Sequence, residues 1–395
     1  MRFKPVPVSS ELHRLGGEGA VFRADFRNIE DELTARYAGK ARVVYIDPPF
    51  NTGGAFEYRQ GKKQLAYRDD MPREEYFSMM RRAAELSKRL LAEDGTFFLH
   101  VDFRVSARLR MICDEVFGEN AFTNEIIWVY KSGGRTRRSF SRKHDTILMY
   151  RMSPESYFNI EAVGKPRGAK RRNHMKKCLD DMGRVYFSIR SNGREYRYYE
   201  DDPVYPSDVW DDIEHLHQRD PERTGYLTQK PEALLKRVIL SCSREGDVVI
   251  DLFGGSGTTA VTAAKLGRSF VTVDKEDLAV AVTRRRLLER CLKLRLYDAA
   301  RPMTVELSEP SSDKLPDFER YFDVSEDKGR ALLKVKRAPK DARLRSVISG
   351  FVENGVFNAT EYDLEPSFGD EFRVDGGKAV HVVDEDFNEY YFTLE

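Results

Sequence analysis

A tetrapeptide that follows an apolar run has the residue types needed to hold a flat, amino-bearing base. The apolar run covers 42–46 and leads directly into Asp47, Pro48, Pro49 and Phe50. Asp47 offers a side-chain oxygen, Pro48 offers a backbone carbonyl, and consecutive prolines stiffen the loop that presents both. Phe50 offers a ring on which an extruded base can stack. These residues are the candidate catalytic group.

Such a group could orient an exocyclic amine, such as that of adenine or cytosine, for attack on an electrophile. Such an amine is a poor nucleophile because its lone pair is delocalised into the ring. Hydrogen bonds from its N–H groups to fixed acceptors favour a pyramidal nitrogen, and positioning against an electrophilic methyl supplies much of the rest. The alternative interpretation of the tetrapeptide, taken alone, is a structural Pro-Pro turn after a strand.

A second apolar run, 247–250, ends in a glycine loop suited to a nucleoside-containing cofactor. Its candidate binding residues are Asp251, Phe253, Gly254, Gly255, Ser256, Gly257 and Thr258. Glycines let a ligand approach the backbone closely, and the following helix offers its N-terminal N–H groups to an anion. Asp274 lies 20 residues after Gly254, at the end of the next expected strand, where an acidic residue can bind ribose hydroxyls. A dinucleotide site is the alternative, but Gly-Gly-Ser-Gly-Thr-Thr is not its Gly-x-Gly-x-x-Gly pattern.

The two motifs together resemble those of amino-group DNA methyltransferases that use S-adenosyl-L-methionine. Because the catalytic motif comes first, the match is to the circularly permuted beta class with a DPPF motif. The chain is similar to type III restriction-modification modification subunits and related adenine-N6 DNA methyltransferases over about 20–150 and 226–295. The matching segments are 45–53, 93–96, 100–102, 114–118, 124–128 and 143–148.

The resemblance implies further site residues. Asp25 and Phe26 match the pair that binds and packs on the cofactor's adenine, although a strand-end turn with a core aromatic is the alternative. Lys230 lies in a Thr-Gln-Lys-Pro segment expected beside the cofactor's methionine end. Asp102 is expected to order a loop at the border of the site. His144 is expected to have a structural or DNA-contacting role instead of a direct catalytic one.

The elements around these motifs alternate between strand and helix. Strands are expected at 19–25, 42–46, 95–101, 125–130, 146–150, 247–250 and 269–273, and helices at 29–37, 74–91, 105–117, 231–241 and 258–266, with a last helix ending near 294. This alternation predicts an α/β fold with a doubly wound, mostly parallel sheet. With the resemblance, the fold class is a circularly permuted Rossmann-like methyltransferase fold with an inserted DNA-recognition region and a small β-rich C-terminal unit.

The chain is expected to divide into five parts. They are a catalytic half (1–130), a target-recognition region (131–227), a cofactor-binding half (228–298), a linker (299–345) and a small acidic β-rich unit (346–395). Helical and strand periodicity largely fail between 131 and 228, where this class places its target-recognition region.

The formal net charge of +1 hides a strong asymmetry. Residues 131–197 carry 18 Lys and Arg against 6 Asp and Glu, whereas 346–395 carry 2 against 12. A basic segment beside a base-binding motif suggests phosphate contacts, although a charge run alone is usually a solvated face. The candidate DNA-binding residues are Lys131, Arg135, Arg137, Arg138, Lys143, Lys170, Arg171 and Arg172.

The acidic tail is too apolar for a disordered segment. Gly376 and Gly377 between two apolar runs predict a hairpin turn. We expect a small β unit that packs on the catalytic domain away from DNA, or one that supports self-association as a homodimer.

Composition narrows the class of protein. No apolar run approaches the roughly 20 residues that span a bilayer, and the first residues do not resemble a signal peptide. The scattered cysteines predict free thiols in a reducing cytoplasm and no metal site. They are Cys113, Cys178, Cys242 and Cys291.

The leading hypothesis is a cytoplasmic, site-specific methyltransferase acting on the N6 of a flipped-out adenine in double-stranded DNA. Asp-Pro-Pro-Phe occurs more often with adenine-N6 enzymes, so a cytosine-N4 enzyme is the runner-up. A DNA-binding specificity subunit with a catalytic partner, or an RNA target, is a further alternative. A cognate restriction endonuclease is a possible partner.

Overall fold

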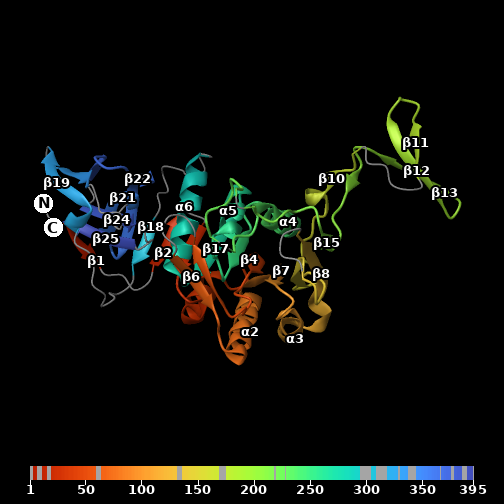
Figure 1. Cartoon of the computed structure of the whole chain (residues 1–395), viewed down its shortest axis with the longest axis horizontal. Helices are drawn as coiled ribbons and strands as arrows, with labels where there is room; N and C mark the ends of the chain where they lie inside the picture. Colours follow the sequence, from red (N-terminus) through yellow and green to blue (C-terminus); the bar gives the residue numbers. More distant parts are fainter. Residues whose placement is uncertain are drawn as a thin grey trace.

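A mostly parallel group of eight strands, part of a larger sheet, carries the loops of interest (Figure 1). The computed structural model describes residues 3–6, 11–15, 19–58, 64–130, 136–168, 175–217, 219–226, 228–293, 304–307, 318–327, 330–336, 344–364, 366–374, 378–384 and 389–394. The parallel strands lie in the order β3 (Gly19–Arg23), β17 (Ser269–Asp274), β16 (Val248–Asp251), β4 (Ala41–Ile46) and β7 (Leu91–Val101). The α/β fold with a mostly parallel sheet is therefore confirmed.

The sheet continues beyond β7 with mixed pairing. Strand β9 (His144–Arg151) runs antiparallel between β7 and β8 (Phe122–Val129), and β15 (Val209–Trp210) pairs parallel with β8. Strand β4 is buried on both faces, since Val43, Val44, Tyr45 and Ile46 are at most 1% exposed. This burial explains why the strand has a continuous apolar sequence without alternation.

Helices cover both faces of the sheet (Figure 1). One face packs against α1 (Glu30–Tyr37), α2 (Arg73–Leu90) and α3 (Ser106–Phe117), and the other against α4 (Glu232–Cys242), α5 (Thr258–Lys265) and α6 (Asp277–Lys293). Helix α2 shows why: its buried residues recur every three or four positions and so form one stripe. They include Tyr76, Met80, Ala83, Ser87 and Leu90.

The site forms where the chain leaves two neighbouring strands in opposite directions. Strand β16 pairs with both β17 and β4. From β16 the chain passes through α5 to β17, whereas from β4 it passes through α2 to β7 on the other side. Such a divergence leaves a crevice at the carboxyl ends of the strands, which is where open α/β sheets bind ligands.

Two segments expected as irregular contain strands. The polar stretch after the catalytic tetrapeptide forms a hairpin of β5 (Gly54–Tyr58) and β6 (Gln64–Asp69). In the segment expected to recognise the target, β11 (Lys176–Leu179), β12 (Val185–Ser191) and β13 (Arg194–Tyr199) form an antiparallel sheet that projects from the body (Figure 1). The pair of β10 (Lys165–Pro166) and β14 (Pro203–Val204) lies at its base.

The C-terminal strands extend the central sheet. From its far edge they lie in the order β1 (Phe3–Val6), β25 (Glu389–Leu394), β24 (Lys378–Asp384), β21 (Leu344–Glu353), β22 (Val356–Leu364), β18 (Thr304–Leu307) and β2 (Glu11–Leu15), and β2 pairs with β3. Strands β1 and β2 come from the segment expected in the catalytic half, and the segment expected as a linker contains β18.

A smaller sheet covers part of this C-terminal region. It consists of β19 (Phe322–Asp327), β20 (Arg330–Val335) and β23 (Glu371–Val374). The predicted hairpin is wrong in its pairing, because β23 pairs with β20 while β24 pairs with β21 and β25. The expected turn residues Gly376 and Gly377 lie outside the described part of the chain. Both strands pair with partners from elsewhere in the fold instead of with each other, and the local sequence does not reveal those partners.

A buried ion pair joins the C-terminal strands to α6. Arg284 of α6 pairs with Glu389 of β25, and each side chain is 2% exposed. His381 Nε2 lies 3.0 Å from the same carboxylate oxygen of Glu389. The C-terminal strands therefore pack on α6, at the opposite end of the molecule from the projecting sheet (Figure 1).

We expect Glu389→Gln to lower the free energy of unfolding by roughly 3 kcal/mol, because it leaves the Arg284 guanidinium buried without its carboxylate. Denaturant unfolding monitored by circular dichroism measures the change. Arg373→Met is the matched control, because its pair with Asp327 is exposed at 63% and 43% and its loss should cost at most about 0.5 kcal/mol. Equal midpoints for Glu389→Gln and the wild type would contradict this role for the ion pair.

Candidate functional site

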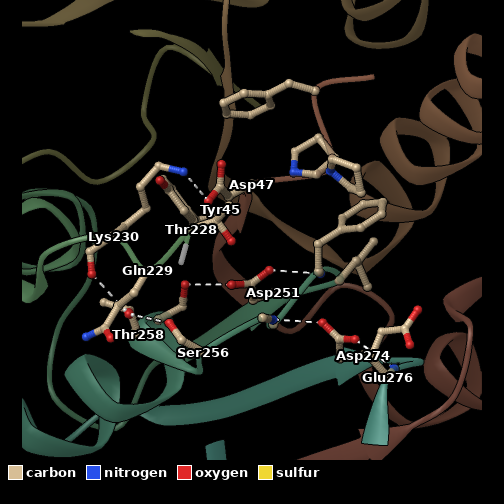
Figure 2. A pocket seen from close by; sticks show the side chains of 18 of the residues that line it. Tyr45, Asp47, Thr228, Gln229, Lys230, Asp251, Ser256, Thr258, Asp274 and Glu276 are labelled. Atoms are coloured by element: carbon tan, nitrogen blue, oxygen red, sulfur yellow. Dashed lines mark hydrogen bonds and ion pairs between the residues drawn. The ribbon is translucent and has the colours of Figure 1, made fainter. Parts of the chain in front are cut away.

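The structure brings the predicted catalytic and cofactor residues together around one cavity of about 400 Å³ (Figure 2). The cavity opens at the carboxyl ends of β3, β4, β16 and β17. Predicted residues that line it are Asp25, Phe26, Asp47, Pro48, Pro49, Phe50, Lys230, Asp251, Phe253, Gly254, Gly255, Ser256, Thr258 and Asp274. Gly257 is part of the same loop but does not line the cavity.

The catalytic loop presents one carboxylate oxygen that has no partner. Asp47 Oδ2 lies 2.5 Å from Lys230 Nζ, which reaches across from the segment before α4 (Figure 2). Asp47 Oδ1 is buried and has no hydrogen-bond partner among the described residues. The Phe50 ring lies next to both, with its centroid 5.1 Å from Lys230 Nζ. The loop therefore offers a buried acceptor beside an aromatic ring.

Glycine is required at different positions of this loop for different physical reasons. A Cβ on Gly254 would lie 2.3 Å from Thr272 Oγ1, and a Cβ on Gly257, which has φ +75°, would lie 2.5 Å from Thr283 Oγ1. These two positions need glycine for packing. Gly255 has φ +50° and lines the cavity, and the nearest atom to its Cβ would be in the Tyr226 ring at 3.7 Å. It is the position that leaves backbone open to a ligand.

Asp251 holds the start of the glycine loop. Its Oδ1 accepts a hydrogen bond from the Phe253 backbone N–H (2.9 Å), and its Oδ2 accepts one from Thr259 Oγ1 (2.6 Å). Burial raises the pKa of Asp251 to about 7, against the opposing effect of these two donors. This side chain therefore braces the loop from beneath.

Asp274 braces the loop from the neighbouring strand. Its Oδ2 accepts from the Gly255 backbone N–H (2.8 Å), and its Oδ1 accepts from the Glu276 backbone N–H (2.9 Å) (Figure 2). Burial raises the pKa of Asp274 to about 6. The residue expected to bind ribose thus also fixes the backbone of Gly255, and Glu276 lines the cavity beside it.

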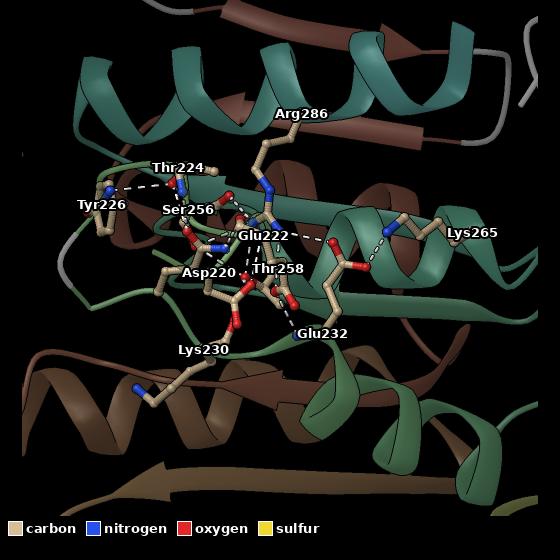
Figure 3. A network of polar contacts seen from close by, with 11 residues as sticks. Asp220, Glu222, Thr224, Tyr226, Lys230, Glu232, Ser256, Thr258, Lys265 and Arg286 are labelled. Atoms are coloured by element: carbon tan, nitrogen blue, oxygen red, sulfur yellow. Dashed lines mark hydrogen bonds and ion pairs between the residues drawn. The ribbon is translucent and has the colours of Figure 1, made fainter. Parts of the chain in front are cut away.

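A polar network beneath the cavity fixes the start of α5 (Figure 3). Arg286 of α6 donates from Nη1 to the Ser256 carbonyl (2.7 Å) and to Thr258 Oγ1 (3.0 Å), and from Nη2 to Glu232 Oε1 (3.2 Å). Thr258 Oγ1 in turn donates to the Lys230 carbonyl (3.1 Å). Sequence reasoning missed Arg286 and Glu232. An arginine on the apolar face of an expected helix was the available signal.

Asp25 and Phe26 have structural contacts as well as positions on the cavity. Asp25 Oδ1 accepts from the Arg27 backbone N–H (3.0 Å), and Asp25 Oδ2 pairs with the Arg27 guanidinium (2.6 Å). Burial acts to raise the pKa of Asp25, but the hydrogen bonds and charge of Arg27 outweigh it and lower the pKa. Phe26 is buried and packs edge to face on Phe253, with ring centroids 5.4 Å apart.

A chain of buried polar side chains lies beneath the catalytic loop. Tyr45 Oη lies 2.6 Å from His100 Nδ1, and His100 Nε2 lies 3.2 Å from Asp145 Oδ2. Tyr130 Oη donates to Asp145 Oδ1 (3.0 Å). Burial raises the pKa of Tyr45 well above its ordinary value, and the charge of Asp47 adds to this. Tyr45, His100 and Asp145 lie within the matching segments, and Tyr130 lies two residues after one of them. None of the four was predicted as a site residue, although polar residues in buried strands are a signal.

Asp102 and His144, whose roles the sequence left open, differ in their position relative to the cavity. Asp102 lines the cavity, accepts from the Arg104 backbone N–H (2.8 Å) and pairs with the Arg104 side chain. Burial raises the pKa of Asp102. His144 is exposed and does not line the cavity. His215 does line it, half-buried, and sequence reasoning missed this residue because it lies in a region without periodicity.

The predicted DNA-contacting residues are only partly described. Arg137 and Arg138 are exposed, in a segment whose Phe140 is 97% exposed, and Lys143 is half-buried where β9 begins. Lys131, Arg135, Lys170, Arg171 and Arg172 lie outside the described residues. Their role as phosphate contacts stays a prediction.

The sequence matches a known family over the segment that builds this site. A family model for N6/N4 enzymes, described as DNA methylase, matches residues 41–285. This match covers more than half of the chain. The chain belongs to the N6/N4 DNA methylase family. The resemblance drawn from the two motifs is therefore confirmed.

Relatives of this methylase include restriction-modification enzymes. It is 27% identical over 293 residues to the type II methyltransferase M.EcaI of Enterobacter cloacae, covering 62% of this chain and 64% of that protein. It is also 27% identical to the DNA adenine methyltransferase YhdJ of Escherichia coli, covering 65% and 79%. The solved PvuII cytosine-N4-specific DNA methyltransferase is 13% identical, with a TM-score of 0.47, covering 72% of this chain and 92% of that one. The chain thus spans about two thirds of the length of M.EcaI.

Two features, a membrane-spanning helix and a metal-binding cluster, are absent from the described residues. None of the helices seen there combines the length and apolar character that crossing a membrane requires. The same residues contain no group of three or more His, Cys, Asp and Glu placed to hold a metal ion.

We expect the methylase to lose stability relative to Asp251→Asn as the pH rises from about 4 to about 7. The pKa of Asp251 is about 7 in the folded protein against an ordinary 3.8, so in this window the folded state keeps a proton that the unfolded state has released. Rising pH then favours unfolding, by up to about 1.4 kcal/mol per pH unit. Denaturant unfolding at several pH values measures the difference between the two proteins. A pH-independent difference would contradict the elevated pKa.

Proposed function

We propose that this chain is a site-specific, cytoplasmic DNA methyltransferase that methylates the exocyclic N6 of a flipped-out adenine in double-stranded DNA. The observation that carries the proposal is Asp47 Oδ1, a buried acceptor without a partner among the described residues, in the cavity that the glycine loop also lines. A buried acceptor left unpaired is costly unless a ligand supplies its donor. An amine entering this cavity supplies that donor.

The cofactor is S-adenosylmethionine, which supplies an electrophilic methyl group when bound. The residues present suit it. A cavity of about 400 Å³ lies in the ordinary range for small-molecule sites. Gly255 leaves its backbone open at the cavity, and the start of α5 follows with N–H groups for a carboxylate. Asp25 and Asp274 provide acceptors for amino and hydroxyl groups, and Phe26 and Phe253 provide apolar surface.

The catalytic loop acts on the target amine by orientation. Asp47 Oδ1 accepts a hydrogen bond from one N–H of the amine, and the Pro48 carbonyl accepts one from the other. Phe50 offers its ring to the extruded base. These contacts favour a pyramidal nitrogen whose lone pair is available for attack, and fixed acceptors lower the barrier without having to reorganise.

Adenine is favoured over cytosine by the Asp-Pro-Pro-Phe motif and by the similarity to a relative named as a DNA adenine methyltransferase. Cytosine-N4 is the second candidate, because the same acceptors suit either exocyclic amine. Phosphate contacts by Arg137, Arg138 and Lys143 would position the duplex. A cognate restriction endonuclease is a proposed partner, in keeping with the similarity to type II methyltransferases.

The proposal is tested by expressing the chain in a host that lacks DNA methylation. Nucleoside mass spectrometry distinguishes N6-methyladenine from N4-methylcytosine, and sequencing with modified-base detection returns the recognition site. Detection of N4-methylcytosine would instead support the second candidate, a cytosine-N4 methyltransferase. Unmodified DNA, with purified protein that binds S-adenosylmethionine but does not methylate DNA in vitro, would favour a specificity subunit or another target.

We expect Asp47→Ala to slow methyl transfer by about 10²-fold or more, because the target amine loses its oriented acceptor. Cofactor affinity should fall by no more than a few-fold, because Asp47 serves the amine and its loss affects the cofactor only through the charge left on Lys230. Transfer of labelled methyl to DNA and calorimetric titration of S-adenosylmethionine measure the two effects. Asp31→Ala, an exposed carboxylate on α1, is the control and should leave both unchanged. Normal turnover by Asp47→Ala would remove Asp47 from the mechanism.

We expect Gly255→Val and Asp274→Ala to weaken S-adenosylmethionine binding by about 10-fold or more. The first places a branched side chain on backbone that faces the cavity, and the second removes an acceptor that also fixes Gly255. Gly193→Val is the matched control for backbone strain, because it has φ +77° and open space but lies on the projecting sheet. Unchanged affinity in both site variants, with folding intact, would refute the placement of the cofactor.

A further inference from the structure

We propose that Lys230 is a positioning residue for the catalytic carboxylate, holding Asp47 Oδ2 so that Oδ1 faces the target amine. The inference rests on the proposed function and assigns Lys230 a role different from the expected contact with the cofactor's methionine end. Figure 2 shows the Lys230 side chain directed at Asp47, on the opposite side of the cavity from Asp274.

The first step of the argument is the asymmetry of the carboxylate. Lys230 Nζ lies 2.5 Å from Asp47 Oδ2, while Asp47 Oδ1 is buried without a partner among the described residues. A carboxylate with two equivalent oxygens can rotate, and an amine could then meet either one. With one oxygen held by a charge-assisted hydrogen bond, the other has a defined direction.

The second step is that the pair is shielded. The side chains of Lys230 and Asp47 are 12% and 18% exposed, so bulk water and salt screen their attraction only weakly. The ammonium also lies 5.1 Å from the centroid of the Phe50 ring, within the range of a cation–π contact. The Lys230 side chain thus contacts both the Asp47 carboxylate, through Oδ2, and the proposed stacking ring of Phe50.

The third step is that the lysine starts from a fixed backbone. The Lys230 carbonyl accepts a hydrogen bond from Thr258 Oγ1, which in turn is held by Arg286 (Figure 3). Pro231 follows directly and restricts Lys230 to extended conformations. The start of α5, beside the cofactor loop, therefore sets the position from which the ammonium reaches the catalytic loop.

The fourth step concerns charge. The cofactor is a sulfonium cation, so an unpaired ammonium in the same cavity would oppose its binding. Paired with Asp47, the ammonium is neutralised, and the pair adds no net charge beside the sulfonium. The geometry therefore suits an ammonium that stays on Asp47 during the reaction.

Lys230→Met in the full-length chain tests the inference. We expect kcat for DNA methylation to fall by about 10- to 100-fold, because the acceptor loses its fixed direction. KM for DNA and the calorimetric Kd for S-adenosylmethionine should stay within a few-fold of the wild type. Lys230→Arg should recover most of kcat, since a guanidinium can also hold Oδ2. Lys236→Met is the control for charge, because Lys236 is exposed on α4, the helix that follows Lys230.

A second readout does not depend on turnover. DNA with 2-aminopurine next to the target adenine reports extrusion of that adenine by fluorescence, and the target keeps the N6 amine that Asp47 is proposed to contact. We expect Lys230→Met to alter this signal in the wild-type background but to add nothing in an Asp47→Asn background, because residues that act through one another are not additive. A merely structural role would change the signal equally in both backgrounds. Lys230→Gln repeats the test if Lys230→Met does not fold.

The outcomes are distinguishable. Wild-type protein that does not methylate DNA would refute the proposed function itself. If the wild type is active, the inference fails in either of two ways. One is that Lys230→Met keeps kcat at saturating cofactor but binds S-adenosylmethionine at least 10-fold more weakly, which would make Lys230 a cofactor contact. The other is that Lys236→Met loses kcat to the same extent.

Discussion

Pairing between β4 and β16 is the constraint on which the site depends. These strands lie far apart in the sequence, yet Val43 pairs with Val249 and Val44 with Ile250 in parallel register. Both strands therefore end at the same edge of the sheet, and the loops that follow face one cavity. The chain leaves the two strands in opposite directions, so helices do not close the space between them. The proposed methyl transfer requires a cofactor and a target base to meet, and this register brings the two loops to one cavity.

Most polar groups around the cavity are hydrogen-bonded to one another, so a buried acceptor without a partner is informative. One oxygen each of Asp251 and Asp274 accepts from the backbone of the glycine loop, and the second oxygens accept from the Thr259 hydroxyl and the Glu276 N–H. Arg286 donates to the Ser256 carbonyl and the Thr258 hydroxyl beneath the loop. Such a braced loop is organised before a ligand arrives, which reduces the entropic cost of binding. Against this background Asp47 Oδ1 stands out as an acceptor that awaits a donor.

The accessory parts lie at opposite ends of the sheet (Figure 1). The projecting sheet of β11, β12 and β13 extends from one end. Its strands belong to the basic segment that is proposed to recognise the target. At the other end the acidic C-terminal strands continue the sheet through β18 and β2, and Arg284 pairs with Glu389 between α6 and β25. Helix α6 also carries Arg286, so one helix contacts both the C-terminal strands and the cofactor loop.

The sequence by itself determined the α/β class, both motifs and the family, because buried parallel strands and special loops leave local patterns. Tertiary structure decided the rest. Lys230 meets Asp47, and His100 meets Tyr45 and Asp145, across long sequence separations that no local pattern encodes. Strand β1 pairs with β25, and β23 with β20, because edge strands select partners by their position in the assembled fold. Local sequence indicates the residue types of the proposed site, whereas only packing decides which oxygen of the Asp47 carboxylate is left without a partner among the described residues.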